Sequence, residues 1–119
     1  MKIVNQQKDF CGTYNVDLES AKLDQLVVVS EDVFNGALVE GVRYDSSDNM
    51  SGWWLTSKSY SGNTDDLKLE HISHIYEKRK DLIKFLGLPF GFKFFQEKYV
   101  SENSPEDVWF DEDVLNGIE

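Results

Sequence analysis

Short apolar runs separated by polar loops constrain the fold of this chain more than any other feature. Four of these runs are rich in β-branched or aromatic residues, a composition typical of strands that pack against a core. They span 26–29, 37–44, 53–56 and 90–100. Asn35-Gly36 is a strong turn signal because both residues tolerate a positive φ, so the first two runs are predicted to form a hairpin.

A single segment has the three- and four-residue period of an amphipathic helix. Its apolar positions begin near Leu67 and extend to Leu86, and a glycine and a proline follow them. Asp65 or Asp66 can cap its first turn. The period slips around residues 79–81, so the pattern predicts either one helix or two short helices with a break there.

A last short strand is predicted at Val108-Trp109-Phe110, paired with residues 92–98 in a hairpin. A helical turn capped by Ser104 is the alternative, and we prefer the strand. The sequence therefore predicts an α+β fold, with an antiparallel sheet of about five strands and a helical segment packed on one face. Residues 26–119 are expected to form this single domain. Residues 1–25 lack a sustained period and are expected to form an N-terminal extension packed on it.

Negative charge is concentrated at the end of the chain. The 119 residues carry 22 acidic and 12 basic side chains, and residues 101–119 hold seven acidic groups and no basic one. Such a field repels phosphate backbones and anionic lipids, and it attracts cationic protein surfaces. We therefore expect neither a nucleic acid nor a membrane as partner, although the acidic end also fits a role in solubility alone.

The lack of a recognisable targeting signal and the single cysteine indicate the compartment. The chain has no apolar run long enough to cross a membrane, and no apolar signal segment follows Met1. Cys11 is the single cysteine, so no intramolecular disulfide can form. These features predict a cytoplasmic protein.

Catalytic motifs are missing from the sequence. It has no Gly-x-Ser-x-Gly nucleophile motif and no glycine-rich phosphate loop. His71 and His74 stand three residues apart on the predicted helix, near Asp65 and Asp66, so the histidines could share a face and bind a metal. Solvated or partly packed histidines explain the same spacing, and we prefer that interpretation. We expect no catalytic residue, no metal and no cofactor.

Aromatic residues beside acidic ones indicate a surface for another protein. Neighbouring residues of a strand point to opposite faces, so one of Trp53 and Trp54 enters the core and the other, taken as Trp54, lies on the second face. Burial of all the tryptophans is the alternative. Trp109 is flanked by acids, as an anchor inside a charged rim would be. The predicted partner-binding residues are two tryptophans and seven acids: Trp54, Asp65, Asp66, Glu106, Asp107, Trp109, Asp111, Glu112 and Asp113.

Five short motifs follow one another along residues 26–96. They are Val28-Val29-Ser30, Gly41-Val42-Arg43-Tyr44, Ser51-Gly52-Trp53, Leu88-Pro89-Phe90-Gly91 and Phe94-Phe95. In this order and spacing the chain resembles a family of bacterial immunity proteins from polymorphic toxin systems, first catalogued as a domain of unknown function. Residues 1–25 find no counterpart in that resemblance.

The resemblance implies a cytoplasmic antidote, encoded beside a toxin, that binds the toxin tightly and neutralises it by steric occlusion without a cofactor. An acidic inhibitor suits a toxin with a cationic surface. The second hypothesis is a regulatory protein-interaction domain that has no toxin partner. The third is a metal-dependent enzyme that uses His71 and His74.

Overall fold

The computed structural model describes residues 2–35, 39–46, 49–57, 67–96 and 107–115. An N-terminal helix precedes a sheet of short strands, with further helical segments between them; η1 and η3 are 3-10 helices. In chain order the elements are α1 (Lys2–Thr13), β1 (Leu26–Ser30), η1 (Glu31–Asn35), β2 (Val39–Arg43), β3 (Met50–Ser57), β4 (Leu67–His71), α2 (Ile72–Lys78), η3 (Lys80–Gly87), β5 (Phe92–Gln96), β6 (Asp107–Phe110) and α3 (Glu112–Leu115). The predicted α+β class is confirmed.

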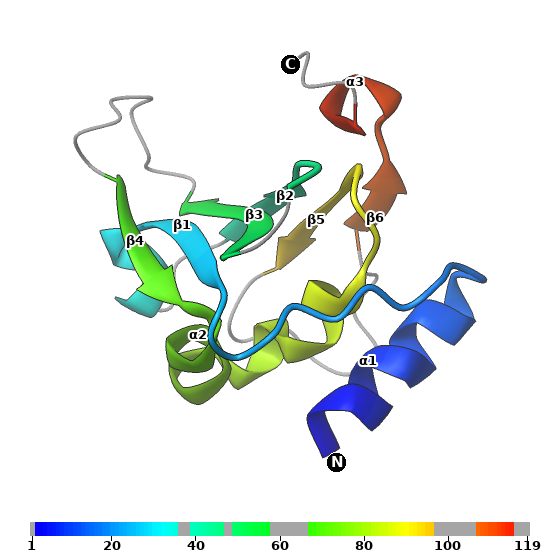
Figure 1. The fold of residues 1–119 in the computed structure, drawn as a ribbon, viewed down its shortest axis with the longest axis horizontal. Coiled ribbons are helices and arrows are strands. Elements are labelled where there is room, and N and C mark those ends of the chain that lie inside the picture. The colour runs from blue at the N-terminus through cyan, green and yellow to red at the C-terminus, as the bar shows by residue number, and fades with distance from the viewer. Residues whose placement is uncertain (1, 36–38, 47–48, 58–66, 97–106, 116–119) are drawn as a thin grey trace.

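The strands form one six-stranded sheet in the order β4-β1-β3-β2-β5-β6. Strands β1 and β3 are parallel, and every other neighbouring pair is antiparallel. Figure 1 shows β4 at one border of the sheet and β6 at the other. The predicted last hairpin is confirmed, because β5 and β6 pair with Phe94 opposite Val108.

The predicted first hairpin is wrong. Strand β1 pairs with β3 and β4, and β3 lies between β1 and β2. The physical reason is that residues 31–35 continue from β1 as the 3-10 helix η1, so no two-residue turn returns the chain to the edge of β1. Val27, Val28 and Val29 are all buried, which suits a strand with neighbours on both edges.

The predicted helix starts later than its apolar period. Residues Leu67–His71 form β4 against β1, and α2 begins only at Ile72, so neither Asp65 nor Asp66 is its N-cap. Of the two alternatives, the break is confirmed, because Arg79 has a non-helical backbone that separates α2 from η3. Arg79 is buried and donates a hydrogen bond to the Val33 carbonyl at 2.7 Å.

Helices α1, α2 and η3 lie along one side of the sheet (Figure 1) and cover its core face. From the sheet, Trp53, Leu55 and Phe94 enter this core, and the Phe94 ring stacks on Phe85 of η3 at 4.3 Å between centroids. Aromatic side chains therefore join the helical layer to the sheet.

Helix α1 belongs to the same core and is attached to it by polar groups as well. Phe10 and Cys11 are buried with the residues of η3. The fully buried Gln7 amide donates to the Tyr76 hydroxyl at 2.8 Å and to the Ile83 carbonyl at 2.9 Å. Among the described residues, no helix is long and apolar enough to cross a membrane.

Candidate protein-binding surface

The sheet face opposite the helices carries one continuous row of side chains. Alternation along β3 sends Trp53 into the core and Trp54 to the opposite face. The strand register then aligns residues with Trp54 on both sides, across all six strands. From the β4 border to the β6 border the row is Leu69, Val28, Trp54, Val42, Lys93 and Trp109, and we call these six residues the open face.

Exposure varies along this row. Leu69 is 56% exposed, whereas Trp54 and Trp109 are each 37% exposed. Val28 and Val42, between these large side chains, are buried. Large apolar groups that stand out of a buried apolar floor are typical of surfaces that bind another protein.

Aromatic neighbours hold the two exposed tryptophans of the open face. Tyr44 packs edge-on against Trp54 with ring centroids 5.9 Å apart, and Phe95 lies 5.3 Å from the Trp109 ring. A ring fixed by packing loses little conformational entropy when a partner covers it. Both tryptophans are thus suited to act as anchors.

A shallow hollow lies beside Trp54, toward the β4 border. It has a volume of about 310 Å³ and is mostly apolar, lined by Val28, Trp54, Leu67, Lys68 and Leu69. The hollow could receive an apolar side chain of a partner.

The acidic residues of the predicted site gather after the β6 end of the open face. Glu112 and Asp113 are exposed on α3, directly after β6. Asp111 lies between them and β6, and its carboxylate is 3.5 Å from the Lys93 ammonium. It also accepts a hydrogen bond from the Asp113 backbone N–H at 3.0 Å. The three acids thus follow Trp109 closely in the chain, and Asp111 contacts Lys93, the residue that pairs with Trp109.

Of the four remaining predicted acids, one lies among the described residues. Asp107 begins β6 opposite Phe95. Asp65, Asp66 and Glu106 lie outside the described residues. Leu69 is the most exposed member of the open face and was not predicted from the sequence, because its spacing to Ile72 and Ile75 suited a helix. The two leucines at the start of β4 are two residues apart, and this alternation is the signal that could have indicated a strand.

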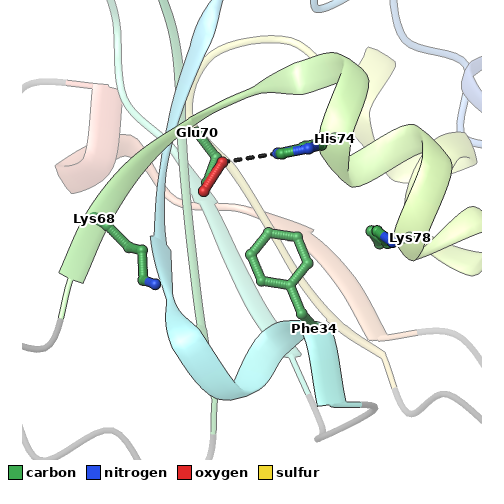
Figure 2. A pocket seen from close by; sticks show the side chains of 5 residues that line it. All are labelled: Phe34, Lys68, Glu70, His74 and Lys78. Atoms are coloured by element: carbon green, nitrogen blue, oxygen red, sulfur yellow. Dashed lines mark hydrogen bonds and ion pairs between the residues drawn. The ribbon is translucent and has the colours of Figure 1, made fainter.

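A second hollow lies on the helix side of β4 (Figure 2). Its volume is about 320 Å³, and it is lined by Phe34, Lys68, Glu70, His74 and Lys78. His74 Nδ1 is 2.8 Å from a Glu70 carboxylate oxygen, and the imidazole meets the Phe34 ring at a steep angle. Groups of both signs line this hollow, so it favours no single class of charged ligand.

The two histidines do not share a helix face, so that prediction is wrong. His71 ends β4 opposite Leu26 and, by alternation, lies on the side opposite Glu70, whereas His74 in α2 contacts Glu70. The reason is that residues 67–71 are a strand. Within the described parts of the chain, no group of three or more His, Cys, Asp or Glu residues could hold a metal ion.

Three of the motifs that carry the family resemblance meet at Arg43, on the core side of β2. Its buried guanidinium donates to the carbonyls of Ser51 at 2.9 Å, Leu88 at 2.7 Å and Glu19. The Phe90 ring lies 4.8 Å from its charged carbon. Burial lowers the pKa of Arg43 to about 10, and the nearby charge of Glu19 opposes this shift. We call this cluster the Arg43 centre.

Two glycines of these motifs allow the backbone to close around Arg43. Gly52 has a φ of +88° and Gly91 a φ of +95°. The Gly91 N–H donates to the Arg43 carbonyl at 2.7 Å, and the Tyr44 N–H donates to the Gly52 carbonyl at 2.8 Å. These motif glycines therefore serve the packing around Arg43, whereas the exposed members of the open face, Leu69, Trp54 and Trp109, lie outside the motifs.

Comparison with known families decides the classification. The model of the Imm33-like domain matches residues 6–111, which is most of the chain. The chain belongs to the Imm33-like family. The name indicates an immunity-protein family. No curated protein and no solved structure matches this Imm33-like chain. The matched range includes most of α1, whereas the resemblance of the short motifs began only at residue 26.

Proposed function

We propose that this Imm33-like protein is the immunity protein of a polymorphic toxin system. It acts in the cytoplasm, where it binds a toxin encoded beside it and neutralises the toxin by steric occlusion. Membership of the Imm33-like family is the observation that carries the proposal. The open face supports it, because an anchored aromatic surface suits the binding of another protein and needs no catalytic group or cofactor.

The proposed binding surface is the open face with its acidic surroundings. Trp54 and Trp109 supply the two anchors. Steering charges come from seven acids: Asp65, Asp66, Glu106, Asp107, Asp111, Glu112 and Asp113. Because these charges are negative, the favoured partner is a toxin with a cationic surface, and nucleic acids and membranes are disfavoured.

Occlusion follows from the width of the open face. The row from Leu69 to Trp109 crosses all six strands, so a toxin that contacts both ends is covered over the full breadth of the sheet. Desolvated aromatic anchors lower the dissociation rate, whereas the acidic rim raises the association rate. Fast association and slow dissociation together favour a complex that forms quickly and persists.

Co-expression with the product of the adjacent upstream gene tests the proposal. We expect the two proteins to co-purify, the growth defect caused by that gene to disappear, and calorimetry to give a nanomolar Kd. The double variant Trp54→Ala/Trp109→Ala should bind at least tenfold more weakly. Leu23→Ala is the matched control, because Leu23 is 47% exposed and does not belong to the sheet.

Salt dependence separates steering from contact. Raising the ionic strength should slow association and leave dissociation nearly unchanged. Tight binding that survives the double tryptophan variant would move the interface away from the open face. A complex without any effect on growth would favour a regulatory interaction domain, and absence of a complex would refute the toxin partner tested.

A further inference from the structure

Strand β6 is an edge strand with aromatic side chains exposed on both of its faces. Within the described sheet it pairs with β5 alone. Trp109 is 37% exposed on the open face, and Phe110 is 49% exposed on the other side. A flat partner docked on one face can cover only one of these rings. An additional strand beside β6 would cover the outer flanks of both.

The backbone of β6 presents hydrogen-bonding groups to that outer edge. The Asp111 N–H donates to the Gly91 carbonyl at 2.9 Å, so residue 111 faces β5. In an antiparallel pair the residues alternate between facing the neighbour and facing away. Trp109 therefore directs its N–H and C=O toward β5, whereas Val108 and Phe110 direct theirs outward. These groups are the template for another strand.

Charge next to the edge selects the occupant. Asp111, Glu112 and Asp113 follow β6 directly, and residues 101–119 contain no lysine or arginine. A second copy of this chain would bring two acidic edges together, which is repulsive. An extended segment rich in lysine or arginine would instead gain opposite charge along the same edge.

We propose that β6 accepts an extended, cationic segment of a partner protein as a seventh strand of the sheet. The segment pairs with the outward groups of Val108 and Phe110. Its apolar side chains cover the ring on one face of the sheet, and cationic side chains on its other face lie over the second ring. This is strand addition, a mode in which backbone hydrogen bonds supply affinity and side chains supply specificity. The inference deepens the proposed function and rests on it only for the identity of the partner as a toxin.

A synthetic peptide tests the edge without knowledge of the toxin. The probe is a capped octapeptide of alternating arginine and valine, and its glutamate–valine counterpart is the control. With the full-length protein, we expect saturable binding of the arginine peptide only. The amide protons of Val108 and Phe110 should become protected from hydrogen exchange, because they would then be bonded to the added strand.

Two variants of one residue isolate the backbone contribution. Phe110→Ala and Phe110→Pro both remove the ring, but only proline removes the outward N–H. Proline is tolerated on an edge where this group does not pair with β5. We expect Phe110→Ala to weaken the arginine peptide a few-fold and Phe110→Pro to weaken it at least tenfold further. Circular dichroism of each variant checks the fold.

Two substitutions of opposite charge provide a second readout if the proline variant does not fold. Phe110→Lys should abolish binding of the arginine peptide, whereas Phe110→Glu should retain it. Equal effects of alanine and proline in folded proteins, equal binding of both peptides, or a dimer formed through β6 would each overturn the proposed strand addition. Peptide binding without a complex with the upstream gene product would support the strand addition and refute the toxin partner.

Discussion

Trp53 and Trp54 are neighbours in β3 and have opposite environments. Trp53 is fully buried, packs edge-on against Phe94 at 5.4 Å and donates its indole N–H to the Leu86 carbonyl at 3.1 Å. Trp54 is 37% exposed and has an apolar hollow beside it. The same side chain therefore serves the core on one face of the strand and is available to a partner on the other.

The same division separates the Arg43 centre from the open face. Motif residues such as Ser51 and Leu88 bind the buried guanidinium with their carbonyl oxygens. Leu69 and Trp109, the exposed ends of the open face, lie outside every motif that carries the family resemblance. Substitutions on the two faces should consequently have different effects: loss of stability on the core face and loss of binding on the open face.

The largest expected effect comes from the two tryptophans themselves. Trp53→Ala should lower the free energy of unfolding by about 3–5 kcal/mol, because it leaves a cavity in the core and removes one of the donors to the Leu86 carbonyl. Trp54→Ala is the matched variant and should cost roughly 1 kcal/mol or less, as at an exposed position. Urea unfolding measures both. Similar losses for the two variants would contradict the division between the faces.

Replacement of Arg43 should have the next largest effect. Arg43→Met keeps much of the side-chain volume but leaves the Ser51 and Leu88 carbonyls without their donor, at a cost of roughly 2–4 kcal/mol. Arg43→Lys can satisfy only part of this set and should lie between Arg43→Met and the wild type. The midpoint of urea unfolding checks the order. A neutral Arg43→Met would show that the Arg43 centre contributes nothing net to stability.

Sequence patterns predicted a strand best where its composition was typical of strands and its pairing partner lay close by in the sequence. The β5–β6 hairpin is an example, because its two aromatic strands are close in sequence. Strand β4 was missed because Leu69, Ile72 and Ile75 keep a three-residue spacing across the junction between strand and helix. The parallel pairing of β1 with β3 depends on tertiary contacts that no local turn signal records.

The sequence indicated single members of the candidate surface but not the surface itself. Alternation placed one of Trp53 and Trp54 on the second face, taken as Trp54, and Trp109 was selected from its acidic neighbours. Their alignment in one row depends on the register of β2 against β3 and of β5 against β6. Strand order fixes that alignment, and the sequence left strand order open.

A smaller loss is expected when a side chain is added at Gly52. A Cβ there would meet the Tyr44 carbonyl, and the φ of +88° is unfavourable for alanine, so Gly52→Ala should cost about 1–3 kcal/mol. Gly12→Ala is the control, because Gly12 lies in α1 with open space around it and should gain roughly 0.5–1 kcal/mol of stability. Opposite shifts in Tm would confirm that backbone closure near Arg43 needs glycine.

The smallest expected effect is a loss of stability in alkaline solution, which also depends on the core side. Burial raises the pKa of Cys11 above 9.0 and that of Tyr76 above 10.0. The unfolded chain therefore releases these protons at a lower pH than the folded chain does. Stability should be fully retained below about pH 9 and should fall as the pH rises beyond it.

Two variants attribute this alkaline loss to its sources. Cys11→Ala should flatten the fall between about pH 9 and 10, because the thiol that titrates first is then missing. Tyr76→Phe should flatten it above about pH 10 but also costs the hydrogen bond to the Ala21 carbonyl. The lowered pKa of Arg43, about 10, acts in the opposite direction above that value, so unfolding is best compared below it. If stability is independent of pH between 8 and 10, the Cys11 thiol is not held neutral by the fold.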